Sequence, residues 1–392
     1  MSGFDFAART RVAYGVGRVK QLAEDVKSLT GGGNEAVLVT DPGLVKVGVA
    51  DEVLAALREG GVEAVLFSDV QSDPTSASID AAAEVIRASK ASCVIGLGGG
   101  SAMDVAKLAS LVAGAEHPTE HYALMANPFA PKMIKTIMVP TTSGTGAEVT
   151  STVVFSNSEK RKVWGWDYDL APDLAVLDPT LSVALPPHLT AATGLDALIH
   201  ALEAVAGKRG NAMIEAVGLQ AIRMISDSLL TAIREPGNLE ARGRLSIGSM
   251  LAGMAIEQGG TGIAHCIGHA LGTLARVHHG RAVAIALYHT YDWNIAGNEA
   301  TLANIARAMG AVENASAGLE EQARAGAAFY RRLVEQSGLQ LSLTDEGLTP
   351  ADASRLAETM ASAENAPMRN NNCRYASDED LARFAEQLLA QA

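Results

Sequence analysis

The first half of the chain alternates short apolar runs with amphipathic segments. Four runs rich in β-branched residues end at Gly, Asp or Pro, which predicts strands at 35–41, 63–70, 93–100 and 135–142. Between them, segments such as 49–61 and 78–89 repeat apolar residues with a helical period. Two further strand-like runs, 151–157 and 174–181, complete this half. Strands that alternate with helices are typical of a parallel sheet covered by helices on both faces.

The pattern changes after Pro186 and Pro187. Long segments rich in Ala, Leu and Met take a 3.6-residue period, which predicts helices at 190–206, 211–234, 237–257, 301–309, 318–337 and 378–390. We therefore expect an α/β domain with a Rossmann-like parallel sheet over residues 1–186 and an all-helical domain over residues 187–392.

Composition narrows the class of protein. The 392 residues carry a net charge of −13 without a long basic block, which argues against nucleic acid or an anionic membrane as partner. The N-terminus lacks the apolar region of a signal peptide, and we expect no apolar stretch of the roughly 18 residues that span a bilayer. Cys93, Cys266 and Cys373 are odd in number and scattered, which fits a reducing cytoplasm. Without a CxxC pair, any metal must be held by His and carboxylates.

Residues 94–107, VIGLGGGSAMDVAK, run from a strand through glycines into a helix. This arrangement presents backbone N–H groups and a helix N-terminus to a phosphate, and glycine allows close approach. Ser101 fits the N-cap position, and Asp104 completes an S-x-x-D capping pattern. The alternative is a purely structural turn before a capped helix, because the motif is neither G-x-G-x-x-G nor a Walker A loop.

Two further features suit a nucleotide. Asp41 ends the second predicted strand, where a carboxylate would hold ribose hydroxyls and repel a 2′-phosphate, favouring NAD over NADP. It would equally well begin the turn at Pro42-Gly43. The loop at 139–152, VPTTSGTGAEVTST, is rich in hydroxyl groups, which is typical of a polar-ligand loop and also of an ordinary Thr-rich turn.

A candidate metal site comes from two helical segments. In 190–205, with Thr190 as a plausible N-cap, Asp196 and His200 are spaced i,i+4 and share one face. His265 and His269 repeat this spacing in GIAHCIGHALGTLARVHHG (262–280), which continues to a pair of histidines about three turns further on.

One carboxylate and up to three imidazoles suit Fe²⁺ or Zn²⁺ in a tetrahedral site. The alternative is a plain Asp–His hydrogen bond in an apolar surrounding. Glu203, one turn past His200, is either an acceptor behind a ligand imidazole or a solvated helix position.

Five blocks, GGGSAMDVAK, VPTTSGTGAEVT, LTAATGLDALIHALEA, GIAHCIGHALG and HHG, resemble in order the motifs of the iron-containing (group III) alcohol dehydrogenase family. The resemblance covers essentially the whole chain. It implies a dehydroquinate-synthase-like architecture, with a dinucleotide-binding α/β domain, a metal-binding helical domain and a cleft between them for the nicotinamide. It also implies a metal-dependent, NAD(P)-linked oxidoreductase that interconverts an alcohol and an aldehyde or ketone, and a homodimer.

The resemblance assigns roles to individual residues. It implies that Asp196, His200, His265 and His279 bind the metal and that His269 relays a proton or orients the substrate. The dinucleotide contacts that it implies are Asp41, Gly98, Gly99, Gly100, Ser101, Asp104, Thr141, Thr142, Thr145 and Lys162.

The chain departs from the family pattern at three positions. His278 stands where Pro is common before the last ligand, and Asp73 stands where an Asn that meets the adenosine is common. Cys373 replaces Pro in a segment where relatives build the pocket wall, so we expect an unusual substrate preference. Cys266, beside a ligand, is a small core residue or a fifth ligand.

Other functions share this architecture. A glycerol-dehydrogenase-like enzyme uses three metal ligands and usually zinc, so His200 weighs against it, and the four-ligand set also weighs against a maleylacetate reductase. A dehydroquinate-synthase-like lyase would need a cluster of Lys and Arg in the helical half. A non-enzymatic NAD-binding or metal-sensing protein would not need both sites. Because aromatic residues make up only 4%, a small aliphatic alcohol or aldehyde is the expected substrate.

Overall fold

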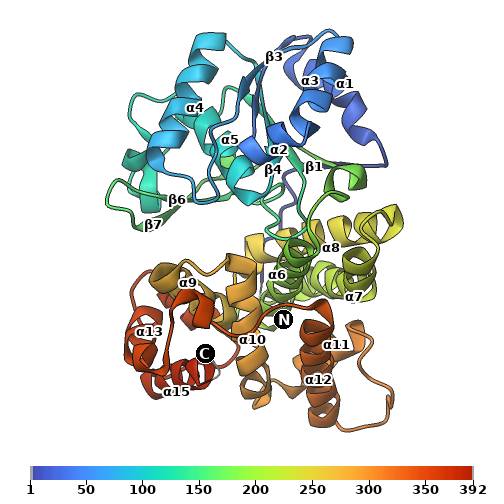
Figure 1. Ribbon diagram of the computed structural model, residues 1–392, viewed down its shortest axis with the longest axis vertical. Helices are drawn as coiled ribbons and strands as arrows, with labels where there is room; N and C mark the ends of the chain where they lie inside the picture. Colours follow the sequence, from blue (N-terminus) through green and yellow to red (C-terminus); the bar gives the residue numbers. More distant parts are fainter. Residues whose placement is uncertain (1–2, 391–392) are drawn as a thin grey trace. The chain divides into compact units, whose positions relative to one another are not determined.

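The computed structural model describes residues 3–390 and divides the chain into two compact units (Figure 1). One unit is Ala7–Ala184, and the other begins at Leu185 and includes the described residues up to Phe6. The boundary lies close to the expected position at 186. The expectation that the first residues belong to the α/β domain differs from the structure, because Phe6 packs against the core of the helical unit.

The α/β unit contains a six-stranded sheet in which all pairs are parallel. Its strands, in spatial order, are β1 (Arg11–Tyr14), β8 (Leu174–Leu177), β5 (Lys135–Pro140), β4 (Cys93–Gly98), β2 (Glu35–Val39) and β3 (Glu63–Phe67). The parallel sheet is therefore confirmed, and β1 is an additional edge strand.

Alternate residues of each central strand face opposite layers. In β2, Val37 and Val39 pack with α4 (Ser76–Ser89) and α5 (Gly100–Val112). Ala36 and Leu38 pack with α1 (Leu22–Thr30) and α3 (Val49–Glu59). Helices therefore cover both faces of the sheet, which explains why its central strands are continuously apolar.

The expected strand at 151–157 lies outside this sheet. Strands β6 (Thr152–Ser156) and β7 (Lys162–Trp166) form an antiparallel hairpin. The remaining elements of the unit are short: α2 (Pro42–Lys46), η1 (Arg18–Gln21), η2 (Thr119–Met125), η3 (Tyr168–Leu170) and η4 (Pro179–Ser182).

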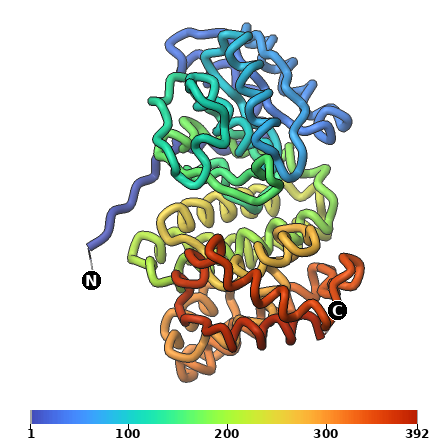
Figure 2. Tube along the Cα trace, turned by 90° about the vertical axis from the view of Figure 1, so that its left-hand side faces the viewer, coloured from blue at the N-terminus to red at the C-terminus, as the bar shows by residue number. Residues whose placement is uncertain are grey.

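The second unit is helical, and Figure 2 traces it in colours from green to red. Its helices are α6 (Pro187–Ala206), α7 (Ala212–Arg234), α8 (Leu239–Gly259), α9 (Ile263–Ala275), α10 (His279–Ile295), α11 (Glu299–Ala308), α12 (Leu319–Ser337), α13 (Ala353–Met360), α14 (Ala366–Asn371) and α15 (Asp378–Leu389), with short turns η5 (Thr344–Glu346) and η6 (Pro350–Asp352). An extensive apolar core fills this unit.

Helix α6 is the central element of the helical unit. It packs against α7, α8 and α10 and is buried along most of its length. Helices α6 and α7 are each long and apolar enough to cross a membrane, judged by length and composition alone. The expectation that the chain has no such segment is therefore wrong. The cause of the apolarity of α6 is burial: 83% of its most apolar window lies inside the protein, as in a core helix.

Candidate metal centre and dinucleotide loop

Three of the residues predicted to bind the dinucleotide lie together at the carboxyl ends of three neighbouring strands. Strand β4 lies between β2 and β5, so Asp41, Gly98 and Thr141 follow adjacent strands at the same edge of the sheet. Thr141 N donates to Gly98 O at 2.9 Å. The chain order reverses direction between β2 and β4, and ligands of open α/β sheets bind at such switch points.

The glycine-rich turn has the shape of an anion-binding loop. Gly98 has φ +149°, a conformation that L-residues rarely adopt, and a Cβ there would lie 2.8 Å from that of Ala102. Helix α5 begins at Gly100 with Gly99 as N-cap, and no side chain caps it. The helix N-terminus therefore presents backbone N–H groups where a phosphate would bind.

The expected capping box is wrong. Ser101 lies inside α5, and its Oγ donates to Ser72 O at 2.9 Å instead of capping the helix. Asp104 accepts from Val154 N at 3.0 Å and pairs with Lys107 at 3.1 Å. These contacts hold the Asp104 carboxylate within the protein, so they account for its presence without a ligand.

Lys107 is a buried cation that the sequence analysis did not single out. Its Nζ donates to three backbone carbonyls, those of Ala147, Thr150 and Thr152, at 3.1, 3.3 and 2.7 Å. The sequence showed no sign of this arrangement, because backbone carbonyls belong to every residue type. Lys107 thereby fastens α5 to the Thr-rich loop, and Asp104 fastens it to strand β6 just after that loop.

One carboxylate oxygen of Asp41 begins the turn at Pro42-Gly43, as one of the two alternatives for this residue predicted. Its Oδ1 accepts from Gly43 N and Leu44 N at 2.8 and 3.1 Å and so caps α2. Its Oδ2 lies 3.5 Å from the position of a Cβ at Gly98. The carboxylate therefore serves the turn and also puts a negative charge beside the glycine loop.

The remaining predicted contacts lie around the same loop. A Cβ at Gly100 would lie 2.9 Å from Thr145 Cγ2, and one at Gly99 would lie 3.5 Å from Thr142 Oγ1, so the loop and the Thr-rich segment are in close contact. Lys162 Nζ lies 3.8 Å from Asp73 Oδ1. Asp73 thus faces a cation that the resemblance assigns to the dinucleotide.

In the helical unit, three helices supply the predicted metal ligands. Asp196 and His200 lie on α6, His265 lies in the first turn of α9, and His279 is the first residue of α10. The Thr190 cap is wrong, since α6 begins at Pro187. His279 lies on a different helix from His265, because α9 ends at Ala275 and the chain begins a new helix at His279.

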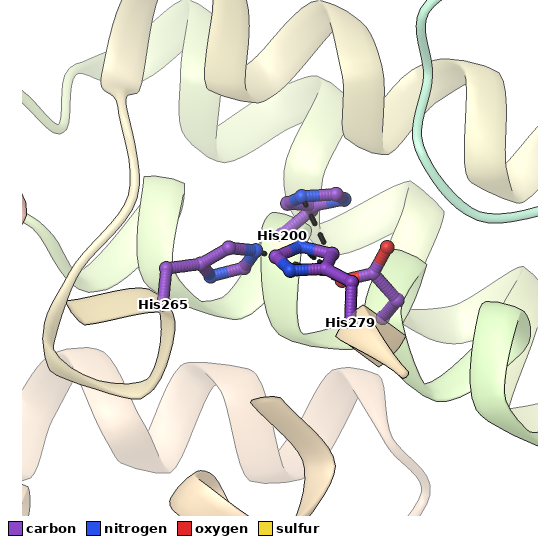
Figure 3. A group of neighbouring side chains, drawn as sticks. His200, His265 and His279 are labelled. Atoms are coloured by element: carbon purple, nitrogen blue, oxygen red, sulfur yellow. Dashed lines mark ion pairs between the residues drawn. The ribbon is translucent and has the colours of Figure 1, made fainter. Parts of the chain in front are cut away.

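The four groups converge on one point (Figure 3). Asp196 Oδ1 lies 3.8, 3.6 and 3.7 Å from the Nε2 atoms of His200, His265 and His279. One ligand atom from each residue lies within 4.8 Å of all the others. A tetrahedron with bonds of about 2.1 Å to N and O has edges of about 3.4 Å, so this spacing is close to that of a metal-ligand shell.

Two buried polar atoms of the cluster indicate whether a cation fits the site. Among the described residues, Asp196 Oδ1 and His265 Nε2 are buried and have no hydrogen-bond partner. Such atoms are costly inside a protein unless a cation or a hydrogen bond satisfies them. The donor set of one carboxylate and three imidazoles fits Fe²⁺ or Zn²⁺.

The cluster is electrostatically coupled. Burial alone would raise the pKa of Asp196, but His200 and His279 hold it below its ordinary value. Burial would lower the pKa of His265, but Glu203 and Asp196 raise it to about 9. The carboxylates and the imidazoles therefore stabilise each other's charged forms, and an apolar, uncharged surrounding is excluded.

Glu203 is an acceptor behind a ligand imidazole, as one of its two alternatives predicted. Its Oε2 lies 2.6 Å from His265 Nδ1, and the residue is buried. Since a carboxylate accepts, the imidazole carries its proton on Nδ1 and turns Nε2 toward Asp196. The HHG block requires glycine at position 280, because a Cβ there would lie 2.4 Å from Ala192 O on α6.

His269 lies one turn after His265 on α9. Its ring centroid is 5.4 Å from that of His279 and 6.5 Å from that of His265, and the residue is half-buried. It therefore borders the ligand cluster without belonging to it. His278 is the exposed N-cap residue of α10, and no side-chain cap bond comes from it.

The two cysteines differ from ligands in their contacts. Cys266 is fully buried, and its thiol donates to Met360 O, so it lies in the core of the helical unit. The thiol of Cys373 donates to Asn294 Oδ1 at 3.4 Å. Asn294 lies at the opposite end of α10 from His279, so this contact is remote from that ligand.

Two family models match the chain. Iron-containing alcohol dehydrogenase matches residues 9–179, and the Fe-containing alcohol dehydrogenase family, C-terminal, matches residues 190–389. Together they cover both units.

Characterised relatives align with nearly the whole chain. The chain is 33% identical over 90% of its length to choline dehydrogenase of Bacillus subtilis, covering 88% of that protein. It is 34% identical to 1,3-propanediol dehydrogenase of Citrobacter freundii, with 98% of each chain covered. It is 30% identical to the NAD-dependent methanol dehydrogenase of Bacillus methanolicus, with 96% of this chain and 97% of that protein covered.

Solved structures share the fold. A crystal structure of 1,3-propanediol oxidoreductase superposes with a TM-score of 0.91 at 33% identity, covering 99% of this chain and 100% of that one. Sulfoacetaldehyde reductase from Bifidobacterium kashiwanohense in complex with NAD⁺ gives a TM-score of 0.90 at 26% identity, with both chains fully covered.

Proposed function

Because this chain belongs to the iron-containing alcohol dehydrogenase family, we propose that it interconverts a small aliphatic alcohol with its aldehyde or ketone, using NAD and a divalent cation. The observation that carries the proposal is the convergence of Asp196, His200, His265 and His279 on one point, with the first three residues buried and His279 partly exposed. Iron is the proposed cation, and zinc is the alternative that the same ligands accept.

The metal ligands have a defined chemical task. A divalent cation bound there supplies a Lewis acid for the oxygen of the alcohol or carbonyl substrate. Three neutral imidazoles and one carboxylate leave a net positive charge at the site. Asp196 and His200 are fixed on one helix, while His265 is oriented by Glu203, so the ligands are held in place before substrate binds.

The α/β unit provides the elements for NAD. The proposed pyrophosphate contacts are the N–H groups at Gly99, Gly100 and Ser101 at the start of α5, with Thr141, Thr142 and Thr145 beside them. Lys162, beside Asp73, is a further proposed contact of the dinucleotide. Nicotinamide cofactors carry the hydride, and the protein binds and orients them. We do not include Asp104, because its carboxylate is engaged by Val154 and Lys107.

Asp41 supports NAD over NADP. Its carboxylate lies beside Gly98 at the strand end where the adenosine ribose would bind. A negative charge there would repel a 2′-phosphate. The relatives include an NAD-dependent methanol dehydrogenase and a reductase solved with NAD⁺, which agrees with this choice.

His269 is the proposed proton-handling residue. It borders the ligand cluster, is partly accessible and carries an imidazole, whose ordinary pKa suits proton transfer near neutral pH. Its ring nitrogen would accept the alcohol proton in oxidation and return it in reduction.

The four-ligand set favours this function over its relatives in the superfamily. A glycerol-dehydrogenase-like or maleylacetate-reductase-like enzyme remains the second candidate, and a dehydroquinate-synthase-like lyase the third. The relatives named above act on alcohols as different as methanol, 1,3-propanediol and choline, so the substrate proposal stays at the class of small aliphatic alcohols and aldehydes.

The proposed setting is a homodimer in the cytoplasm, without a nucleic-acid or membrane partner. Strand β1 forms one edge of the sheet and exposes Val12, Tyr14 and the following Val16. An exposed apolar edge strand is a ready pairing surface for a second copy. Light scattering of the purified protein should give twice the mass of one chain.

The test is a reconstitution assay. The protein is stripped with a chelator and reloaded with Fe²⁺ without oxygen, or with Zn²⁺, and then assayed with NADH and NADPH on short aldehydes. We expect metal-dependent oxidation of NADH, and a loss of at least about 10³-fold in His200→Ala. His188→Ala, which changes an exposed histidine on the same helix, is the control. If no metal restores turnover with any carbonyl, the proposed function is wrong.

A further inference from the structure

The first turn of α9 is held by side chains from elsewhere in the helical unit. Gly262 N and Ala264 N donate to the two oxygens of Glu203, at 2.7 and 2.6 Å. Ile263 N, between them, donates to Asn372 Oδ1 at 3.0 Å. Three consecutive backbone N–H groups are therefore satisfied by two side chains, where a helix start usually uses its own N-cap residue.

The Glu203 carboxylate has a second partner. Its Oε2, which accepts from Gly262 N, also lies 2.6 Å from His265 Nδ1. Glu203 is 4% exposed and lies on the same helix as Asp196 and His200. One buried carboxylate thus fixes both the backbone from which His265 projects and the orientation of its ring.

Asn372 connects this turn to two further segments. Its Nδ2 donates to Asn294 Oδ1 on α10 at 2.8 Å and to Arg374 O at 2.7 Å. Both donors of its side-chain amide and the amide oxygen therefore have partners in other residues. The start of α9 is therefore tied to α6 through Glu203 and to α10 and the C-terminal segment through Asn372.

Glycine at 262 makes this arrangement possible. A Cβ at Gly262 would lie 2.6 Å from Asn372 Oδ1 and 3.0 Å from Glu203 Oε1. Any larger residue would push both acceptors away from the backbone. The close approach of all three groups therefore requires glycine at this position.

We propose that Glu203 and Asn372 are positioning residues of the metal centre and form one clamp on the α9 turn. Glu203 holds His265 with its proton on Nδ1 and its Nε2 facing Asp196, and Asn372 holds the turn itself. The inference rests on the proposed metal-dependent function. In this clamp Glu203 is charged and holds both the backbone and a ligand imidazole, whereas Asn372 is neutral and holds the backbone of the turn alone.

The two halves should differ in their effect on metal affinity. Carboxylates that orient a ligand imidazole typically contribute 10- to 100-fold to metal affinity. Glu203 is also a second carboxylate next to a ligand imidazole, so its removal takes away negative charge that favours a bound cation. Asn372 contributes no charge and does not contact a ligand ring, so its removal should loosen the turn with a smaller loss of affinity.

The experiment measures Zn²⁺ affinity of the full-length protein by competition with a chromophoric chelator. Glu203→Gln replaces one acceptor oxygen by an NH₂ group that opposes a backbone N–H, and we expect binding 10- to 100-fold weaker. Asn372→Ala should lower the thermal midpoint while Zn²⁺ binding stays within about fivefold of wild type. Glu215→Gln, which removes an exposed charge in the same unit, is the matched control and should bind Zn²⁺ normally.

Co²⁺ provides a readout that a general loss of stability would not change. The visible absorption of bound Co²⁺ reports the geometry of the ligands, and Glu203→Gln should alter this spectrum at a temperature where circular dichroism shows an intact fold. If Glu203→Gln does not fold, Glu203→Asp keeps the charge but shortens the reach by one methylene, and the same weakening is expected.

The outcomes separate the two claims. If wild type and Glu203→Gln bind Zn²⁺ equally, or if Asn372→Ala weakens binding as much as Glu203→Gln does, the division of roles in the clamp is wrong. If the wild-type protein itself binds neither Zn²⁺ nor Co²⁺, the proposed metal-dependent function is wrong, and the inference fails with it.

Discussion

Asp196 in the helical unit is buried and Asp104 in the α/β unit is half-buried; both are carboxylates inside a helix, but they are satisfied in different ways. Asp104 pairs with Lys107 at 3.1 Å and accepts from Val154 N. Asp196 Oδ1 has three imidazole nitrogens around it at 3.6 to 3.8 Å, and none is close enough for a hydrogen bond.

The difference between the two carboxylates separates a structural cluster from a binding site. Burial raises the pKa of Asp104, and Lys107 and the backbone N–H of Val154, both supplied by the chain itself, reduce that rise in part. The Asp196 cluster instead brings three imidazoles to metal-ligand spacing, and an imidazole gives up its proton when it binds a metal ion. A carboxylate paired with an ammonium from the same helix holds the fold together, whereas one that faces three converging imidazoles is suited to an external metal ion.

The largest expected effect is on the Asp104–Lys107 pair, in which the chain itself supplies both charges. Lys107→Met should destabilise the protein by about 3–5 kcal/mol, because Asp104 and three backbone carbonyls would lose a buried cation. The measurement is urea denaturation followed by circular dichroism, with the exposed Lys20→Met as control. Metal ions should not restore the lost stability. An unchanged midpoint would show that the pair is not structural.

A second effect tests the same cluster through pH. Burial raises the pKa of Glu148, beside Lys107, to about 7. Between its ordinary pKa and about 7, the folded protein keeps a proton that the unfolded chain has lost. The free energy of unfolding should therefore fall as pH rises through this window, by about 3 kcal/mol in total.

Glu148→Gln provides the comparison for the pH effect. The amide cannot ionise, so its urea midpoint should change less between pH 5 and pH 8 than that of wild type, and the variant should be the more stable protein at pH 8. Parallel curves for the two proteins would contradict the assignment of this pH dependence to Glu148.

In contrast to the Asp104–Lys107 pair, the Asp196 cluster should stabilise the folded protein when a metal ion is added. At a Zn²⁺ concentration 100 times its dissociation constant, binding should stabilise the folded state by about 2.7 kcal/mol. Differential scanning calorimetry with and without a chelator measures this shift. His200→Ala should abolish it, since one of the four ligands is lost. Stabilisation of that variant equal to wild type would remove His200 from the ligand set.

The smallest expected effect concerns the neighbour of a ligand. Burial raises the pKa of Cys266 to about 12, so its thiol stays protonated, and it donates to Met360 O. Cys266→Ala should cost about 1 kcal/mol of stability and leave Zn²⁺ affinity unchanged. A loss of affinity in this variant would instead favour the fifth-ligand alternative.

Several elements were predictable because their patterns are local. The strands at 35–41, 63–70, 93–100 and 135–142 match β2, β3, β4 and β5, since buried parallel strands are continuously apolar. Helices α7, α12 and α15 match closely because one face of each is exposed. Helix α10 was not predicted, because it is buried on most sides and shows little alternation of apolar and polar residues.

The site was predictable in part for the same reason. The i,i+4 spacing of Asp196 and His200 follows from helix geometry alone. The expected cap at Ser101 was wrong, because tertiary contacts gave its hydroxyl another partner, Ser72 O. The role of Lys107 was not foreseen, because its acceptors are backbone carbonyls in a loop that is distant in sequence.

By itself, the sequence determined the alternation of strands and helices, the change of character near residue 186, and the residue types and local spacings of the candidate ligands. Apolar periodicity and helix geometry act over a few residues, so they can be seen in the chain directly. Only the tertiary structure decided that His265 and His279, which begin different helices, join Asp196 and His200 at one point. It also decided that Glu203 faces an imidazole and Lys107 satisfies Asp104. These pairings depend on how the helices and loops pack, and packing depends on distant parts of the chain at once.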